Sequence, residues 1–368
     1  MIPRTLPVDS SGFRIDARLP TARKDIFVIG ASLGGFEAAK TLVSELPSNL
    51  KACLFVVLHI GAHGLGVLPE ILEKAGPLPA SNAKDGEAIK EGHMYVAPPD
   101  YHLILERPGL VRISRGPREN GVRPAIDPLF RSAAYAFGPR VVGVILTGSL
   151  DDGTAGLWAI KMRGGTAIVQ EPKEALAPSM PLSALKHVKV DFCLPLKEMA
   201  PLLVKLSHSS VPEKAPLPMP KGIETEVKIA KETNAMEAGI MEWGKPSIYS
   251  CPECHGVLLE KKEGSNLRFR CHTGHAYSLE SLLAGLVDRT EENLWSAIRS
   301  FDETVLLMRR MAAYFSENDQ NAEAEALLKR ADETERRRHA LVQKMKTEVH
   351  ESISGGSEDR KNPQFTNN

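Results

Sequence analysis

The chain has 368 residues, of which 42% are hydrophobic and 25% charged, and its formal net charge is zero. This length exceeds one ordinary core and predicts two or three units of a globular protein. With zero net charge there is no global basic field that argues for nucleic acid or an anionic membrane, so we expect no nucleic-acid partner. No apolar run is long enough for a signal sequence or a membrane span. The five cysteines, an odd number, argue against a disulfide framework. We therefore expect a cytoplasmic protein that is not inserted into a membrane.

Strand-like and helix-like segments alternate from residue 25 onward. Strands are expected at residues 26–29, 53–58, 94–97, 101–106, 110–113, 141–147 and 166–170. Helices are expected at residues 36–46, 67–74, 128–137 and 154–162. The fourth and fifth strands flank a Pro-Gly turn and predict a β-hairpin. Because the remaining elements follow in strand–helix–strand order, residues 25–206 predict an α/β domain with a doubly wound, mostly parallel sheet. An irregular arm at residues 1–24 precedes it.

The rest of the chain is predicted to contain four parts. They are a linker at 207–246 with a helix-compatible piece at 223–231, a cysteine-bearing module at 247–285, a helical hairpin at 286–351 and a disordered tail at 352–368.

Both helices of the predicted hairpin carry apolar stripes. The first stripe, with steps of four and three, consists of Leu294, Ile298, Phe301, Val305, Met308, Ala312 and Phe315. The second stripe is thinner and consists of Ala324, Leu328, Ala331, Leu341 and Met345. Arg338 stands in the second stripe where an apolar residue is expected. Part of the first stripe is therefore predicted to remain available to a partner helix.

Three polar residues follow predicted strands of the sheet. Ser32 lies in Gly30-Ala31-Ser32-Leu33-Gly34, a G-x-S-x-G sequence between a strand and a helix, as a nucleophile elbow requires. The Leu33 N–H, at the start of that helix, is expected to stabilise an oxyanion. His59 ends the next strand and Asp152 follows the strand at 141–147, so all three side chains are expected at one crevice. Their order, Ser, His, Asp, differs from that of the α/β-hydrolases and requires another fold.

Each of these residues also has a purely structural interpretation. Ser32 and Asp152 are each placed to cap a helix, and His59 is placed to be a polar strand end. Their combination at one sheet edge favours catalysis, with Ser32 as nucleophile, His59 as base and Asp152 as the orienting acid. Binding of a dinucleotide is a weaker interpretation, because the G-x-G-x-x-G spacing is absent.

Residues from about 25 to 206 resemble the catalytic domain of the chemotaxis protein-glutamate methylesterases, the CheB family. The matching stretches are VIGASLGG, VVLHI, GHMYVAPPDYHL, RPAIDPLFRSAA, LTGSLDDGTAGL and PSMPLSAL. The resemblance implies hydrolysis of glutamate methyl esters on chemoreceptor helices, with release of methanol and a related deamidation of glutamine. It also assigns Ser32, His59 and Asp152 the same three roles.

The sequence departs from the family pattern at three places. Leu33 stands where the family commonly has threonine, but leucine keeps the backbone N–H. Ser149-Leu150 stands where the family has Met-Gly, which alters the loop beside Asp152. The family's usual N-terminal receiver domain has no counterpart in the roughly two dozen residues before the first strand, so activation by phosphorylation is not expected.

Three of the five cysteines lie close together and, with a histidine, form a metal-binding pattern. Cys251-x-x-Cys254 and Cys271-x-x-x-His275 have the spacing of a zinc ribbon with a closed tetrahedral site. His255 and His272 compete for the fourth position, but ligation by the adjacent Cys271 and His272 is geometrically awkward. Stand-alone family members with similar extensions keep the C-x-x-x-H pair, which supports His275. We expect a structural zinc, no cofactor for catalysis, and a ribbon whose loss leaves the sheet domain active.

Two other function classes compete with the methylesterase. One is a non-catalytic receptor-binding or scaffold module, and the other is a general serine esterase of small molecules. Reactivity of Ser32 separates the enzyme from the scaffold, and methanol release from a methylated receptor separates the methylesterase from the general esterase.

Overall fold

The computed structural model describes residues 23–59, 66–211, 222–231 and 234–355, and side chains to residue 345. The predicted arm (except residues 23 and 24), part of the predicted linker, and the tail beyond residue 355 lie outside the described residues. The chain divides into two compact units, residues 1–285 and 286–368.

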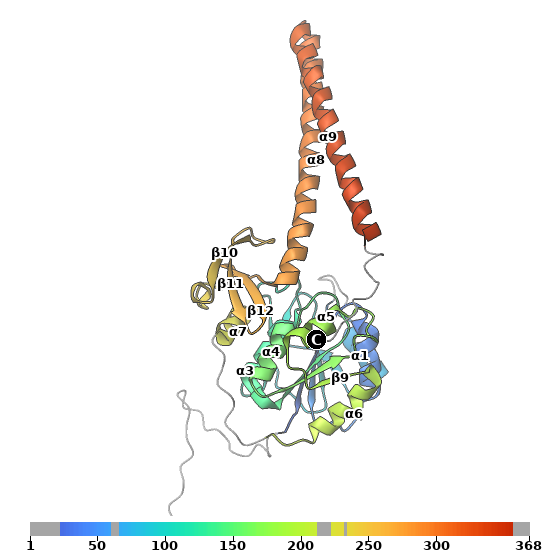
Figure 1. Cartoon of the computed structure of the whole chain (residues 1–368), viewed down its shortest axis with the longest axis vertical. Helices are drawn as coiled ribbons and strands as arrows, with labels where there is room; N and C mark the ends of the chain where they lie inside the picture. Colours follow the sequence, from blue (N-terminus) through green and yellow to red (C-terminus); the bar gives the residue numbers. More distant parts are fainter. Residues whose placement is uncertain (1–22, 60–65, 212–221, 232–233, 356–368) are drawn as a thin grey trace, which may run out of the picture. The chain divides into compact units, whose positions relative to one another are not determined.

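A seven-stranded sheet forms the centre of the first unit (Figure 1). Its order is β3 (Ala80–Asn82), β4 (Met94–Val96), β2 (Cys53–Leu58), β1 (Ile26–Ala31), β7 (Val141–Ile145), β8 (Thr166–Gln170) and β9 (Phe192–Leu194). All six pairings are parallel, as predicted. The sequence did not reveal β3 and β9, which have three residues each and occupy the two edges.

Helices cover both faces of this sheet, so the doubly wound α/β fold is confirmed. One face is covered by α1 (Gly35–Ser44), α2 (Leu68–Ala75) and α6 (Leu196–Ser207). The other is covered by α3 (Ile126–Phe137), α4 (Thr154–Met162), α5 (Ser179–His187) and the predicted hairpin of β5 (His102–Glu106) and β6 (Leu110–Ser114). Two extensive clusters of buried apolar side chains fill the layers between them. Helices α5 and α6 were not predicted. Pro201 lies inside α6, and Pro181 lies in the first turn of α5, so each proline interrupts the helical pattern in the sequence.

The cysteine-bearing module is a small antiparallel sheet in the same unit. Its strands, in order, are β10 (Lys245–Ser250), β11 (Val257–Glu263), β12 (Asn266–Cys271) and β13 (Ala276–Ser278). We refer to these four strands, with the turn between Cys271 and Ala276, as the ribbon.

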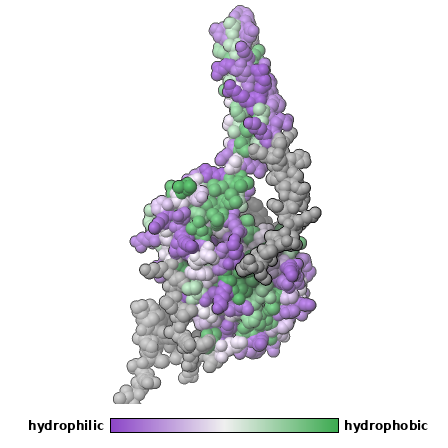
Figure 2. Space-filling model, in the orientation of Figure 1, coloured by the Kyte–Doolittle hydropathy of each residue, from purple (hydrophilic) through white to green (hydrophobic). Residues whose placement is uncertain are grey.

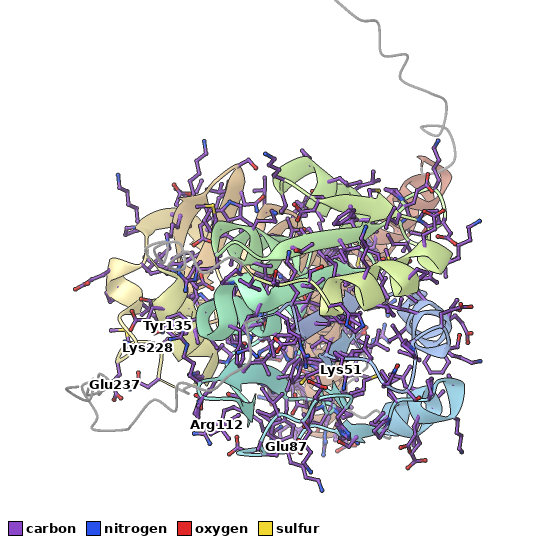
Figure 3. The ribbon with its side chains drawn as sticks, turned by 90° about the horizontal axis from the view of Figure 1, so that it is seen from below. Lys51, Glu87, Arg112, Tyr135, Lys228 and Glu237 are labelled. Atoms are coloured by element: carbon purple, nitrogen blue, oxygen red, sulfur yellow. The ribbon has the colours of Figure 1, made fainter. Side chains whose placement is uncertain are left out.

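The predicted helix-compatible piece of the linker forms α7 (Ile223–Lys231). Its Ile223 and Val227 side chains are buried in the apolar cluster that contains α3. In Figure 3, seen from below, Lys228 of α7 and Tyr135 of α3 mark the two neighbouring helices. Part of the predicted linker is thus built into the compact unit.

The second unit contains most of α8 (Leu279–Glu317) and all of α9 (Asn321–Gly355), which lie side by side (Figure 1). Helix α8 starts before residue 286 and α9 ends after residue 351, so both predicted boundaries of the hairpin are exceeded. All seven residues of the first predicted stripe are buried or half-buried. The surface of the hairpin is largely hydrophilic, with scattered apolar side chains (Figure 2).

The second stripe differs from its prediction at one residue. Leu328 is 46% exposed, and its neighbour Leu327 occupies the inward position. Arg338 pairs with Asp302 of α8, with Nε and Oδ1 3.1 Å apart, which explains a charged residue in this stripe. The predicted partner helix for the hairpin stays a prediction. In the described part of the chain, no helix is both long and apolar enough to cross a bilayer.

Candidate active site and metal cluster

Ser32 lies in the sharp turn between β1 and α1. Its N–H donates to the Thr147 carbonyl oxygen at 2.9 Å, and its own carbonyl accepts the Gly35 N–H at 2.7 Å. Gly34 follows with a φ of 77°, the left-handed conformation that glycine adopts without strain. The turn therefore fixes a partly exposed serine above the carboxyl ends of β1 and β7.

His59 connects Ser32 to Asp152. Its Nδ1 lies 3.1 Å from the Ser32 Oγ, and its Nε2 lies 2.8 Å from Oδ2 of Asp152. An Nε2–H that donates to the carboxylate leaves the Nδ1 lone pair free to accept the serine proton. The His59 side chain is 14% exposed and that of Asp152 only 3%. The structure thus brings the three predicted residues into one hydrogen-bonded chain at the predicted sheet edge.

Asp152 is held at the N-terminus of α3. Its Oδ2 accepts the Ile126 N–H at 2.6 Å, and its Oδ1 accepts the Asp127 N–H at 3.3 Å. The first N–H groups of a helix favour a negative charge. Burial raises the pKa of Asp152, but hydrogen bonds from His59, Ile126 and Asn120 outweigh it and hold that pKa below its ordinary value. Asp152 therefore remains a carboxylate.

The capping interpretations of Ser32 and Asp152 do not describe the structure. The residues that precede α1 and α4 are Gly34 and Gly153, and neither helix has a side-chain cap. Asp152 instead supplies a carboxylate to the start of α3, a different helix. Both side chains are thus free of the local role that such residues most often have.

The predicted oxyanion donor lies beside the serine. Leu33 has an exposed side chain, and its carbonyl oxygen accepts a hydrogen bond from the Thr147 hydroxyl at 2.9 Å. Among the described residues no acceptor is bonded to the Leu33 N–H. This N–H is available for a bound ligand.

The four predicted metal ligands lie together in the ribbon. Their ligand atoms, from Cys251, Cys254, Cys271 and His275, all lie within 4.8 Å of one another. Three thiols and one imidazole are a donor set that Zn²⁺ prefers. On its far side, the His275 ring places Nε2 3.3 Å from a Glu253 carboxylate oxygen, as metal-bound histidines commonly do. The residues present fit a metal ion.

A cluster of six buried charged residues, which we did not predict, joins the ribbon to the sheet domain. Its members are Glu119, Asp127, Arg131, Glu226, Arg268 and Arg270. Every one of these side chains is at most 2% exposed.

The bonds of this ionic cluster connect β12 to α3, to α7 and to Glu119, which precedes α3 in the chain. Arg268 donates to Asp127 at 2.7 Å, and Arg270 donates to Glu119 at 2.8 Å and to Glu226 at 2.5 Å. Burial would raise the pKa of Glu119, but the three arginines outweigh it and hold that pKa below its ordinary value. From the sequence we expected a ribbon that is independent of the sheet domain. The structure instead fixes the ribbon to that domain through buried charges, which become unpaired if the ribbon is removed.

The sequence also did not reveal the roles of two further residues, Asn120 and Ser278, which lie where the ribbon meets the sheet domain. Asn120 donates its side-chain N–H to Asp152 Oδ1 at 2.9 Å. Ser278 of the ribbon donates its hydroxyl to Asp151 Oδ1 at 2.7 Å. No sequence signal links these residues, since they lie far apart in the chain. Only Asn120 has a local sequence signal, since Asn-Gly at 120–121 predicts a turn. The structure confirms a turn-like backbone there, with a φ of 54° that asparagine tolerates.

A serine bonded to a histidine that is bonded to a buried aspartate, at the carboxyl edge of a parallel sheet, is the arrangement of serine hydrolases. Comparison with known proteins agrees with this class. Residues 27–203 match the family model described as CheB methylesterase. A relative from Leptospira interrogans, named for methylesterase and glutaminase activities, is 40% identical over 190 residues, 52% of this chain and 98% of the relative.

Other relatives match over about half of their own length. Relatives named protein-glutamate methylesterase/protein-glutamine glutaminase from Methanosarcina mazei and Rhodospirillum rubrum are 34% and 37% identical over 51% and 50% of this chain. The chain spans about half of their length, 53% and 49%. The crystal structure of the Thermotoga maritima CheB methylesterase catalytic domain aligns with a TM-score of 0.48 and 34% identity, over 50% of this chain and 98% of that one. The chain belongs to the CheB methylesterase family, the protein-glutamate methylesterases, which are carboxylic ester hydrolases.

Proposed function

We propose that this chain hydrolyses glutamate methyl esters on chemoreceptor-type proteins, with Ser32 as nucleophile, His59 as base and Asp152 as the acid that orients the histidine. The single observation that carries the proposal is the continuous chain of hydrogen bonds from Ser32 Oγ through His59 to Asp152. The names of the relatives support a substrate that carries glutamate esters or glutamine amides.

The chemistry has two halves. In the first, the Ser32 Oγ attacks the ester carbonyl carbon while His59 Nδ1 takes its proton, and the bond to the methoxy group then breaks as His59 protonates it to methanol. In the second, water loses a proton to His59 and attacks the acyl-serine, and the proton returns to the Ser32 Oγ as glutamate leaves. The same steps on a glutamine side chain release ammonia. Asp152 stays ionised throughout and stabilises the protonated ring.

We assign the oxyanion to the Leu33 N–H. This donor sits one residue after the nucleophile at the start of α1, where the helix dipole favours negative charge. Its availability among the described residues supports the assignment. A backbone donor explains why leucine at this position is compatible with catalysis.

Apolar side chains near Ser32 favour a helical protein substrate over a small ester. Large exposed apolar residues lie on α1 and α5 and in the loops that precede α1, α4 and α5; they are Leu33, Phe36, Leu150, Leu176 and Leu182. Leu176 lies against Gly34, so one of these loops borders the nucleophile turn. Such a rim matches the apolar face of an amphipathic receptor helix that presents a methylated glutamate.

We assign a structural zinc to Cys251, Cys254, Cys271 and His275. Four protein ligands fill a tetrahedral site, so the metal would hold the two ends of the ribbon together and take no part in ester hydrolysis. We further propose that residues 25–206 carry the chemistry, that 247–285 form the metal module, and that the chain is cytoplasmic. The free thiols Cys53 and Cys193 support a reducing compartment.

The test uses membranes that contain a chemoreceptor with isotopically labelled methyl esters. Purified full-length chain is expected to release labelled methanol, and Ser32→Ala is expected to release none above background. Ser44→Ala is the matched control, because Ser44 is an exposed serine that bonds only its own helix at Thr41. Methanol release by Ser32→Ala at the wild-type rate contradicts the proposal. Hydrolysis of a small ester without any release from receptor favours a general esterase instead.

A further inference from the structure

We propose that Asn120 is a positioning residue for Asp152, and that Ser278 and Ser281 of the ribbon region orient its amide. The ribbon would then set the geometry of the ester-hydrolysing site without touching substrate. This inference rests on the proposed function of Ser32, His59 and Asp152.

The two ends of the Asn120 amide face opposite chemical surroundings. On one side its Nδ2 lies 2.9 Å from Asp152 Oδ1 and 3.3 Å from Asp127 Oδ2. On the other side its Oδ1 accepts the Ser278 N–H at 3.0 Å and the Ser281 hydroxyl at 2.9 Å. Donors therefore meet acceptors at both ends of the amide.

Only one orientation of the amide satisfies these partners. A half-turn would place the Asn120 oxygen against two carboxylates and its NH₂ group against the donors of Ser278 and Ser281. In a buried site such mismatches are costly, because no water replaces the lost hydrogen bonds. The carboxylates and the Ser278 N–H have fixed roles, so together they select the orientation in which the amide donates to Asp152, and the Ser281 hydroxyl supports it by donating to Oδ1.

The backbone holds Asn120 at the edge of the ribbon sheet. Its N–H donates to the Ala276 carbonyl of β13 at 2.7 Å, and the neighbouring Glu119 forms a β-bridge with the same residue. Asn120 is itself 9% exposed. The segment thus belongs to the sheet domain by sequence and to the ribbon by hydrogen bonding.

The Asn120 amide helps to fix the rotation of the Asp152 carboxylate. Oδ1 accepts N–H groups from Asn120 and Gly153, which leaves Oδ2 directed at His59 Nε2. Without the Asn120 donor, one of the bonds that fix this rotation is absent. His59 would then spend less time in the orientation that accepts the serine proton, which lowers kcat and leaves substrate binding unchanged.

The ribbon-side residue supplies the most specific test. Ser281 is buried, and its hydroxyl donates to Asn120 Oδ1 and also lies 2.9 Å from the Ser278 hydroxyl, which in turn bonds Asp151. The double variant with Asn120→Ala therefore separates an effect that passes through the amide from one that passes through Ser278 and Asp151. Ser207→Ala is the matched control, because Ser207 is an equally buried helical serine whose hydroxyl bonds the Val204 carbonyl on the far helix α6.

The experiment measures kcat and KM for methanol release from methylated receptor by full-length Asn120→Ala, Ser281→Ala, the double variant and Ser207→Ala. We expect Asn120→Ala to lower kcat by roughly 10- to 100-fold with KM unchanged, as for loss of one hydrogen bond to a carboxylate. Ser281→Ala should lower kcat less, Ser207→Ala should match the wild type, and the double variant should be no slower than Asn120→Ala.

Two results overturn the inference. One is a wild-type kcat for Ser281→Ala, and the other is a double variant whose loss is the product of the two single losses. If Asn120→Ala does not fold, Asn120→Asp replaces it, since it keeps an acceptor for both serines but sets a carboxylate against Asp152. That variant must also lose kcat. A wild-type chain without any Ser32-dependent turnover contradicts the proposed function itself and removes this inference with it.

Discussion

The seven-stranded sheet and the ribbon are held together by different means. Two large apolar clusters enclose the sheet, and its strands are buried on both faces. The apolar cluster that the ribbon shares with the preceding segment is small, comprising Ile229, Ala235, Ala238, Ile240, Trp243 and Leu259. A sheet of this size cannot bury enough apolar surface to fold by itself. We propose that the ribbon depends instead on a metal held by its three cysteines and His275, and on the ionic cluster that it shares with the sheet domain.

The difference matters because the candidate site lies where the two regions meet. The backbones of Ser32 and His59 are held by Thr147 and Ala31 of the sheet domain. Asp152 is positioned from both sides, by the start of α3 and by Asn120 at the ribbon edge. The positions of Ser32 and His59 thus depend mainly on the sheet domain, whereas that of Asp152 also depends on the ribbon.

The largest effect is expected at Asp152. Asp152→Asn should lower kcat by about 10⁴-fold, because the amide favours the wrong ring tautomer of His59. Asp151→Asn is the matched control and should change kcat far less, since Asp151 bonds Ser278 instead of the histidine. Steady-state rates on methylated receptor measure both. A larger loss at Asp151 would reverse the assignment of the acid.

The ionic cluster offers the next largest effect, on stability. Arg268→Ala leaves the buried Asp127 without its bond at 2.7 Å and should lower the free energy of unfolding by about 3–5 kcal/mol. Arg112→Ala breaks surface pairs of a half-exposed arginine with Asp85 and Glu106, and should cost at most about 1 kcal/mol. Urea unfolding measures the two changes. Equal values would show that the cluster does not fix the ribbon.

Removal of the metal tests the coupling between the two regions. We expect about one zinc per chain by elemental analysis and local unfolding of the ribbon after chelation, seen as faster amide exchange in β11 and β12. Because Asn120 then loses its oriented partners, kcat should fall by roughly the 10- to 100-fold expected for Asn120→Ala. Protein purified without chelators that contains no metal, or a metal-free ribbon with unchanged exchange, contradicts this account.

The smallest effect concerns pH. Burial raises the pKa of Asp151 to about 7, against the bond from Ser278, so the folded protein keeps a proton there that the unfolded chain loses above its ordinary value near 4. The associated stability is present at low pH and is lost as the pH rises through about 7. Asp151→Asn should therefore be stabilised relative to the wild type at pH 8 more than at pH 5, by on the order of 1 kcal/mol or more. Urea midpoints that shift equally at both pH values contradict it.

Much of the sheet domain was predictable because its signals are local. The G-x-S-x-G turn, the apolar run at residues 53–58 and the helix at residues 154–162 each reflect neighbouring residues alone. The C-x-x-C and C-x-x-x-H pairs are equally local, and they are brought together as expected. By contrast, Arg268 and Asp127 are 141 residues apart, and Asn120 and Ser281 are 161 apart. Contacts between such distant polar residues leave no periodic pattern, so the attachment of the ribbon could not be predicted.

The central claim is that Ser32 is a nucleophile activated by His59 and Asp152. It is tested most directly by treating the full-length chain with a fluorophosphonate, which reacts covalently with activated serines, and locating the adduct by mass spectrometry. The account predicts one adduct on the peptide that contains Ser32, formed at least 10²-fold more slowly in His59→Ala, as for loss of a positioned base. An adduct on another serine, or labelling of Ser32 at the same rate in wild type and His59→Ala, would contradict it.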